Sequence, residues 1–342
     1  MRPFQEERDA VQVGDRITRS HAHTLAGSTV AGMRTIDWVD GVIEIIDQTA
    51  LPGETTVLRL STVDELIDAV RRLAVRGAPA LGVAGAFGVA LAVSTQPDPT
   101  RAIEAVATAR PTAVNLARGV RRAAARVPEG FDAVLAEAER IRDEEIASSV
   151  AMAKRGADLV RELCGERPKL LTHCNTGALA AVEIGTALGV VLELAERQQL
   201  AGVIASETRP LLQGARLTAW ELRRAGVPYR VAVDGAGPFL MARGEVDAVI
   251  LGADRICANH DVINKIGTYS HALGARAAGI PFIVVAPEST VDEETPSGAD
   301  VEIEERGAAE VAGDLPAANP AFDVTPASLV TAIVTESRVI RP

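Results

Sequence analysis

Four segments predicted to be strands each end in a side chain that can do chemistry. Cys174, Glu207, Asp234 and Asp254 follow apolar runs at residues 169–172, 201–205, 229–233 and 247–251. In an open α/β sheet, ligands bind in the crevice outside the carboxyl ends of the strands. The four side chains together therefore predict one active crevice, with carboxyl groups for proton transfer and a thiol as base or nucleophile. Taken singly, each is equally well explained as a cap or turn residue.

A second group of residues, at predicted helix starts, has the character of an anion-binding site. Arg76-Gly77-Ala78-Pro79-Ala80 places an arginine, a glycine and a proline at the first turn of an apolar helix. Free backbone N–H groups, the helix dipole and a guanidinium together attract a phosphate. Asn264-Lys265-Ile266-Gly267-Thr268 and, more weakly, Arg110-Pro111-Thr112 have the same character. The structural alternative in each case is a helix start with a solvated surface cation.

Two further patterns do not carry chemistry. Gly82, Gly85 and Gly88 lack the spacing of a dinucleotide-binding loop and lie inside a predicted helix, so close helix packing explains them. His173 and Cys174 are adjacent on a predicted strand and point to opposite faces of the sheet. The pair is therefore not expected to form a nucleophilic dyad.

The cysteines indicate the cellular compartment. Cys164, Cys174 and Cys257 are too few and too widely spaced for a disulfide framework, which predicts a reducing cytoplasm. Cys257, His260 and Asp261 crowd one loop, but no further ligand cluster supports a metal there. The sequence therefore predicts neither a metal nor a cofactor.

Composition excludes several classes of protein. The chain has 342 residues, of which 47% are hydrophobic and 24% charged, as in a globular protein with a full core. A formal net charge of −11 and the lack of a basic face argue against a nucleic-acid partner. No apolar run reaches the ~18 residues of a membrane span, so no membrane partner is expected. Residues 1–32 have no secretory signal and are expected to form an N-terminal extension.

The elements that must position these residues change character along the chain. Residues 34–60 alternate in short apolar runs and predict a small antiparallel sheet. Helical spacing then predicts helices at residues 61–75, 80–93, 101–107, 112–126 and 130–164. From residue 169 onward, short apolar strands, the last at 281–286, alternate with segments of helical period at 208–225 and 263–279. That alternation is typical of a parallel, Rossmann-like α/β domain.

The length favours two domains, and the pattern predicts where they divide. We expect the N-terminal sheet and helices over residues 33–129 and a connecting helix over 130–166. The Rossmann-like catalytic domain is expected over 167–342. The fold class is therefore α/β, with a small antiparallel sheet and helices before a parallel α/β domain.

Read in order, these segments resemble the methylthioribose-1-phosphate isomerase family from Met33 to Pro342. The blocks that carry the resemblance are Arg76–Ala80, Arg110–Leu116, Thr172–Gly177, Glu207–Arg216, Gly252–Arg255, Asn264–Thr268 and Asn319–Pro326. The resemblance implies an aldose–ketose isomerase of methionine salvage, active as a homodimer. Its substrate would be 5-methylthioribose 1-phosphate and its product 5-methylthioribulose 1-phosphate.

The resemblance also implies roles for individual residues. By motif position, Cys174 and Asp254 match the catalytic pair. The substrate-binding positions are matched by Arg76, Gly77, Ala78, Arg110, Gln213, Asn264 and Lys265. The anomeric oxygen of such a substrate carries phosphate, so the ring oxygen must be protonated as the ring opens. Asp254 is the candidate acid and Cys174 the candidate base at C2, and a direct hydride shift remains the alternative to an enediol.

Three segments depart from the family pattern: Val182-Glu183-Ile184, Asp234-Gly235-Ala236-Gly237-Pro238-Phe239 and Asn259-His260-Asp261. We expect them near the crevice, where they would affect the 5-substituent of the sugar more than the chemistry. An isomerase of 5-deoxyribose 1-phosphate is therefore one alternative. A non-catalytic regulatory subunit related to the translation initiation exchange factor is a second. A ribose-1,5-bisphosphate isomerase ranks lower, because no additional basic residue for a second phosphate is evident.

Overall fold

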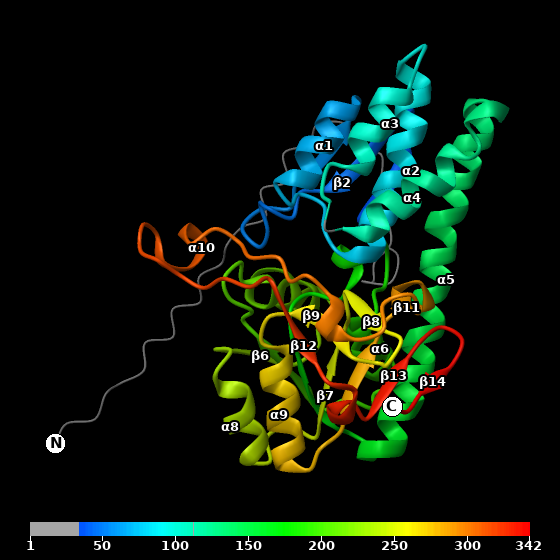
Figure 1. The fold of residues 1–342 in the computed structure, drawn as a ribbon. Coiled ribbons are helices and arrows are strands. Elements are labelled where there is room, and N and C mark those ends of the chain that lie inside the picture. The colour runs from blue at the N-terminus through cyan, green and yellow to red at the C-terminus, as the bar shows by residue number, and fades with distance from the viewer. Residues whose placement is uncertain (1–33, 112) are drawn as a thin grey trace, which may run out of the picture.

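The computed structural model describes residues 34–111 and 113–342, and its architecture is the predicted mixed α/β fold. The expected N-terminal extension and Thr112 of the Arg110 block lie outside the described residues. Figure 1 shows a sheet and a group of helices above a larger sheet, with one long helix running along both. The predicted domain limits at residues 33, 130 and 167 stay predictions.

The upper part contains the predicted antiparallel sheet and helices. The strands β1 (Ile36–Val39), β2 (Val42–Ile46) and β3 (Val57–Leu60) pair in chain order. The helices are α1 (Val63–Arg71), α2 (Ala78–Thr95), α3 (Thr100–Ala107), α4 (Val114–Ala124) and α5 (Phe131–Cys164). Helix α1 ends four residues before the predicted end at residue 75, and the other predicted helices are confirmed.

Helix α2 is the buried centre of this part, as its uniformly apolar sequence predicts. It is long and apolar enough to cross a membrane, but 67% of it is buried inside the protein. A Cβ at Gly85 would lie 2.5 Å from the Leu116 carbonyl oxygen of α4. One at Gly88 would lie 2.7 Å from Leu66 of α1. The glycines therefore allow close helix packing, as predicted from their spacing.

The lower part is built on a seven-stranded sheet with the order β14-β13-β10-β7-β4-β5-β6. All pairs are parallel except β13 with β14. The strands are β4 (Lys169–Thr172), β5 (Gly202–Ser206), β6 (Tyr229–Ala232), β7 (Ala248–Leu251), β10 (Phe282–Val285), β13 (Ala332–Val334) and β14 (Val339–Ile340). The five strands expected from the sequence are confirmed.

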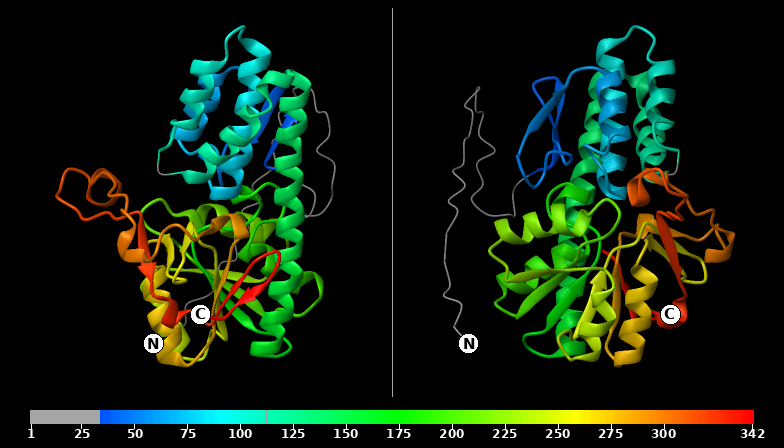
Figure 2. Two further views of the ribbon diagram at one scale, coloured as in Figure 1. Left: turned by 45° about the vertical axis from the view of Figure 1, so that its right-hand side comes forward. Right: turned by 90° about the vertical axis from the view of Figure 1, so that its left-hand side faces the viewer.

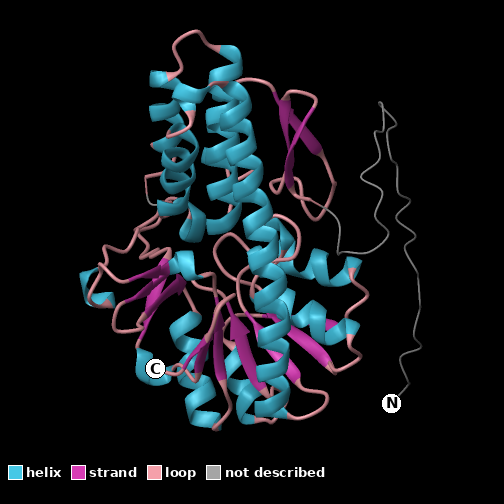
Figure 3. Ribbon diagram, turned by 90° about the vertical axis from the view of Figure 1, so that its right-hand side faces the viewer, coloured by secondary structure: helices cyan, strands magenta, loops and turns pink. Residues whose placement is uncertain are grey.

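Helices cover both faces of this sheet, as Figures 2 and 3 show. Alternate strand residues point to opposite faces. Leu170 and Val203 pack in one core with α5, α6 (Ala187–Glu196) and α7 (Ala219–Arg224). Leu171 and Ile204 pack in the other core with α8 (Ala236–Ala242) and α9 (Thr268–Ala278). This is the doubly wound arrangement that the alternation of strands and helices predicts.

A second sheet of four strands, in the order β11-β8-β9-β12, was not predicted. Its strands are β8 (Arg255–Cys257), β9 (Val262–Lys265), β11 (Val291–Asp292) and β12 (Phe322–Thr325), and α10 (Ala309–Ala312) precedes β12 on a protruding loop. Strand β9 corrects the predicted helix at 263–279, which begins only at Thr268 because Gly267 turns the chain with a φ of +106°. The predicted helix at 208–225 is also shorter, because residues 207–212 form a loop before a π-helix at Gly214–Thr218.

Candidate active site

The candidate site occupies two adjoining cavities between the upper helices and the carboxyl ends of the lower strands. The larger, of about 430 Å³, is lined by Arg110, Asp254 and Glu304 among others. The smaller, of about 60 Å³, is lined by Arg76, Cys174 and Asp254 among others. Gly77, Ala78, Asp254 and Thr290 line both cavities. Asp254 therefore stands where the two cavities meet.

The sheet topology explains why Cys174 and Asp254 come together. Cys174 follows β4 and Asp254 follows the neighbouring strand β7. The chain leaves β4 toward β5 and β6 on one side, whereas β7 and β10 lie on its other side. Such a reversal of strand order opens a crevice at the carboxyl ends of the strands, and ligands of open α/β sheets bind there. The predicted crevice is confirmed for these two strand ends.

The Cys174 backbone is held in an unusual conformation by two threonines. Its φ is +61°, in the left-handed region that side chains other than glycine seldom adopt. The Cys174 N–H donates to Thr208 Oγ1 at 2.9 Å, and its carbonyl accepts from Thr218 Oγ1 at 2.6 Å. The thiol is 9% exposed and lines the smaller cavity. The loop thus directs a single sulfur atom at the cavity.

The Asp254 carboxyl group has the surroundings of a proton donor. Asp254 counts as an exposed residue because it borders open cavities. Many protein atoms nevertheless lie close to its carboxyl group. Burial raises the pKa of Asp254, and the nearby cations Lys265, Arg110 and Arg76 counteract only part of this increase. A raised pKa favours the protonated carboxyl that a general acid needs.

Arg76 is braced from two sides. It is 9% exposed, its Nε donates to Gln48 Oε1 at 3.2 Å, and its Nη2 donates to Asn175 Oδ1. Burial lowers the pKa of Arg76, and the nearby Cys174, Glu221 and Asp254 counteract this. A guanidinium nevertheless stays charged at neutral pH. Arg76 therefore presents a fixed positive charge to the smaller cavity.

The α2 N-terminus lies beside this arginine, as predicted. Gly77 is the N-cap with a φ of +97°, and Ala78 begins the helix. A Cβ at Gly77 would lie 2.5 Å from the Ala180 Cα and collide with its carbonyl oxygen, so only glycine fits. The first free N–H groups of an 18-residue helix therefore face both cavities.

Two more cations complete the predicted anion site. Lys265 ends β9, donates from Nζ to the Ala321 carbonyl at 2.7 Å and lies 4.5 Å from the Phe322 ring centre. Arg110 lines the larger cavity, and its guanidinium has no hydrogen-bond partner among the described residues. Burial lowers the pKa of each, and the negative charge of Asp254 opposes that effect in both. Asp254 is thus surrounded by positive charge.

The remaining two predicted substrate residues differ in outcome. Asn264 lines the smaller cavity and donates to Thr268 Oγ1 at 2.9 Å. Gln213 lines neither of the two cavities. Its Oε1 is buried without a hydrogen-bond partner, so the side chain lies within the protein next to the π-helix. Lys265 also lines neither cavity, although its charge acts on Asp254. The other predicted site residues all line one or both cavities.

Glu207 and Asp234, the other two strand-end candidates, do not reach the cavities, so their predicted place in the crevice is wrong. Asp234 accepts from the backbone N–H groups of Thr208 and Arg209, at 2.8 and 2.7 Å, and from Ser206 Oγ. It therefore fixes the loop whose Thr208 holds Cys174. Asp234 therefore supports the site from behind and is not part of its wall.

His173 also belongs to this supporting layer. Its Nδ1 lies 2.8 Å from Ser206 Oγ and its Nε2 lies 2.8 Å from the Ile266 carbonyl oxygen. Burial lowers the pKa of His173 to about 4. A neutral histidine with both nitrogens engaged is not a base for Cys174, as the alternation of strand side chains predicts.

The three departures from the family pattern lie away from both cavities, which corrects the expectation that they would flank the crevice. Glu183 and Ile184 line an outer groove beside α6. Asp261 accepts from the Gly298 and Ala327 N–H groups at 3.1 and 3.0 Å, which holds the β8–β9 turn. Over residues 34–111 and 113–342, no group of three or more His, Cys, Asp and Glu side chains is arranged to hold a metal.

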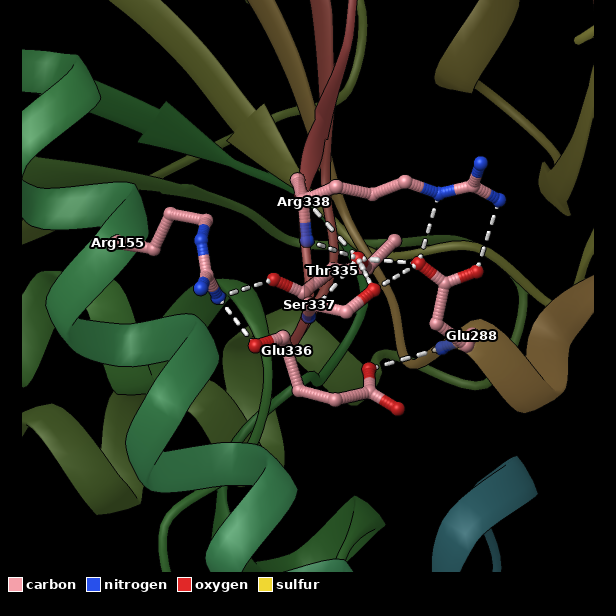
Figure 4. Close-up of polar contacts among 6 residues, drawn as sticks. All are labelled: Arg155, Glu288, Thr335, Glu336, Ser337 and Arg338. Carbon is pink, nitrogen blue, oxygen red and sulfur yellow. Dashed lines mark hydrogen bonds and ion pairs between the residues drawn. The ribbon is translucent and has the colours of Figure 1, made fainter.

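A loop after β10 forms one further wall, and its anchoring was not predicted. Pro287 and Thr290 line the smaller cavity, and Arg118 donates to the Ser289 carbonyl at 3.1 Å. Between them, the Glu288 carboxylate accepts from Thr335, Ser337 and Arg338 of the C-terminal hairpin (Figure 4). These bonds lower the pKa of Glu288 to about 2 despite the opposing effect of burial. The chain end thus holds the site loop.

The chain matches the model of the initiation factor 2 subunit family over residues 74–342. A relative from Anaeromyxobacter sp. (strain K), named methylthioribose-1-phosphate isomerase, is 53% identical over 88% of this chain and 91% of its own length. A relative from Moorella thermoacetica, named 5-deoxyribose 1-phosphate isomerase, is 47% identical over 90% of this chain and 94% of its own.

A longer relative from Nocardia farcinica, named probable bifunctional methylthioribose-1-phosphate isomerase/methylthioribulose-1-phosphate dehydratase, is 52% identical over 90% of this chain. The chain spans 60% of that relative's length. Among solved structures, the 5-methylthioribose 1-phosphate isomerase from Pyrococcus horikoshii OT3 matches with a TM-score of 0.85 and 40% identity, over 92% of this chain and 94% of that one. The chain therefore belongs to the initiation factor 2 subunit family and groups there with relatives named methylthioribose-1-phosphate isomerase.

Proposed function

We propose that this protein isomerises 5-methylthioribose 1-phosphate to 5-methylthioribulose 1-phosphate in methionine salvage. The observation that carries the proposal is that Asp254, a candidate acid, lines the same cavity as Cys174 and Arg76 and lies within the electrostatic reach of three cations, Lys265, Arg110 and Arg76. An enzyme for a sugar 1-phosphate needs an acid near the ring oxygen, a base near C2 and a clamp for the phosphate. The relatives' names favour the same reaction.

The proposed chemistry uses the protein's own side chains. Arg76, Arg110, Lys265 and the α2 N-terminus hold the phosphate, so that binding energy remote from the reacting atoms orients the sugar. Asp254 gives its proton to the ring oxygen as the C1–O bond breaks. The Cys174 thiolate then takes the proton from C2, which leaves an enediol-type C1=C2 double bond. As Cys174 returns that proton to C1, the C2 hydroxyl gives its proton to the Asp254 carboxylate, so the ketone forms and both side chains regain their starting states. In the alternative route, hydrogen moves from C2 to C1 as hydride without a base.

A second substrate, 5-deoxyribose 1-phosphate, is favoured by the relative that carries that name. The two substrates differ only in a methylthio group at C5, which takes no part in the bond changes of the proposed reaction. A single methylene in an apolar pocket is worth about 1–3 kcal/mol, so the larger methylthio group should contribute at least that much to the preference. Both sugars are therefore expected to react, at different rates.

The partner and the compartment are part of the same proposal. We expect a homodimer that acts on a small sugar phosphate, with no cofactor. A cytoplasmic location is supported by the three free cysteines, Cys164, Cys174 and Cys257. Sedimentation equilibrium of the purified chain tests the dimer.

An isomerase assay on the 1-phosphates of 5-methylthioribose and 5-deoxyribose, and on ribose 1,5-bisphosphate, tests the function. Conversion of the methylthio sugar with the highest kcat/KM is the expected result. Preference for the deoxy sugar would replace the substrate and keep the chemistry. If the protein binds these sugars but converts none of them, the proposed isomerase activity is wrong and a regulatory subunit is favoured.

A further inference from the structure

We infer that Glu221 is a positioning residue for the phosphate site, acting on Arg76 through the side-chain amide of Asn175. The inference rests on the proposed function, which gives Arg76 its role. Glu221 lies on α7, is 1% exposed and lines neither of the two cavities. Sequence reasoning missed it, because it stands in a short helix without a recognised motif.

The contacts form a chain of three side chains. Glu221 Oε1 accepts from Asn175 Nδ2 at 2.7 Å, and Glu221 Oε2 accepts from the Ala178 N–H at 2.7 Å. The other face of the same amide, Asn175 Oδ1, accepts from Arg76 Nη2. The Asn175 amide thus bridges a buried carboxylate and a buried guanidinium. Its second N–H points to Thr218 Oγ1 at 3.3 Å.

The direction of these hydrogen bonds gives Glu221 its effect. An ionised carboxylate only accepts, so it fixes the Asn175 amide with its NH₂ toward Glu221 and its oxygen toward Arg76. A guanidinium only donates, so Arg76 needs that oxygen. A neutral amide at position 221 would break this order. Its oxygen would be taken by the Ala178 N–H, and its NH₂ would face the NH₂ of Asn175.

Two donors facing each other would force the Asn175 amide to turn, and its NH₂ would then face Arg76. The guanidinium would lose its hydrogen bond to Asn175 Oδ1 and keep those to Gln48 Oε1 and the Asn175 carbonyl, so it would shift from the orientation in which it meets the phosphate. Burial raises the pKa of Glu221 to about 7, against the opposing effects of Asn175, Ala178 and Arg76. Assays at about pH 8 therefore keep the carboxylate ionised.

The test compares Glu221→Gln with Glu137→Gln in the full chain. Glu137 is also a buried glutamate, 6% exposed, but it pairs with Arg122 and Arg140 and lines none of the cavities described. Glu221→Gln should raise the KM for 5-methylthioribose 1-phosphate roughly 10-fold or more, the size of a lost hydrogen bond to a charged group. The fall in kcat should be smaller. Glu137→Gln should leave KM within twofold of wild type.

Glu221→Asp keeps the carboxylate and should recover part of the lost affinity, which a purely structural role would not predict. If Glu221→Gln does not fold, Asn175→Ala carries the test and must raise KM similarly. Calorimetric titration with inorganic phosphate separates this inference from the proposed reaction. Phosphate binding weakened only in Glu221→Gln supports it even if no sugar is converted, and unchanged binding and KM overturn it.

Discussion

Two arginines line one site and are held in opposite ways. Arg76 is braced by Asn175 and Gln48, and the segment that holds Asn175 is itself anchored by Glu221. The Arg110 guanidinium has no hydrogen-bond partner among the described residues and lies beside a larger cavity; only the Arg110 carbonyl is engaged, by the Ala113 N–H. We therefore expect one wall of the site, the side at Arg76, to be preorganised, and the other, the side at Arg110, to gain partners from a bound anion. These sides are called the braced wall and the open wall.

The difference separates two ways of binding phosphate. A braced guanidinium loses little freedom on binding, so its contacts contribute fully to affinity and orientation. An unbraced arginine must be ordered by the ligand, at about 0.5–1.5 kcal/mol for one long side chain. We therefore expect the braced wall to fix the position of the phosphate and the open wall to add mainly charge.

The largest effect should come from the candidate acid and the candidate base, which both line the smaller cavity. Asp254→Asn and Cys174→Ser should each lower kcat by roughly 10²–10⁴-fold, the contribution of a positioned acid or base. Both replacements keep the size of the side chain, so the thermal unfolding midpoint should change little. Steady-state kinetics of the purified variants measure the loss. Near-normal turnover in either variant would remove that residue from the mechanism.

A smaller effect, on stability and on phosphate binding, should come from displacing the α2 N-terminus beside Arg76. Gly77→Ala adds a Cβ that collides with Ala180, whereas Gly130→Ala adds one at a φ of +94° with no atom within 4 Å. The matched φ isolates the collision from the backbone strain. Gly77→Ala should cost roughly 1–3 kcal/mol more stability than Gly130→Ala, as overpacking does, and should also weaken phosphate binding. Denaturant unfolding of the two variants compares them, and equal losses would show that Ala180 moves freely.

Arginine-to-lysine exchange tests the comparison directly. A lysine at 76 keeps the charge but leaves Asn175 Oδ1 or Gln48 Oε1 without a donor, so KM should rise roughly tenfold. A lysine at 110 breaks no described hydrogen bond, and KM should rise about threefold or less because the charge remains. The KM values of Arg76→Lys and Arg110→Lys, measured side by side, show whether the bracing of Arg76 contributes to binding. Equal increases would mean that bracing adds nothing to binding.

The sequence predicted five of the seven strands of the large sheet, because buried parallel strands are continuous apolar runs, such as Ala248–Leu251. It did not predict β13 and β14, which are three and two residues long. It missed β8 and β11, which are three and two residues long and too short to show a period. Strand β9 was not predicted, because its four residues fit the helical spacing of 263–279 as well as they fit a strand.

For the site, strand ends identified Cys174 and Asp254 but could not separate the wall from its supports. Asp234 has the same position after its strand, yet β6 lies at the edge of the sheet, far from the reversal beside β4. That distinction needs the strand order, which no local pattern contains. Asn175 could have been predicted as a site residue, because it adjoins Cys174 in the block Thr172–Gly177. Glu221 was not, because its burial depends on how α7 packs.

The smallest predicted effect concerns the support behind the braced wall and its dependence on pH. Burial lowers the pKa of His173 to about 4 and that of His271 to about 3, below the usual 6.5. As the pH falls below 6.5, these two histidines take up protons in the unfolded chain but not in the folded one, so their contribution to stability is lost toward pH 4. Each such histidine contributes at most about 1.4 kcal/mol per pH unit.

The measurement is the free energy of unfolding in urea at about pH 7.5 and at about pH 5.5, in wild type and in His271→Leu. The His271 ring touches His173 at 3.3 Å and leaves Nδ1 buried without a partner, so its loss removes one titrating group at little other cost. The variant should lose about 1 kcal/mol less than wild type between these two pH values. An identical loss in both proteins would place the acid sensitivity outside the supporting layer.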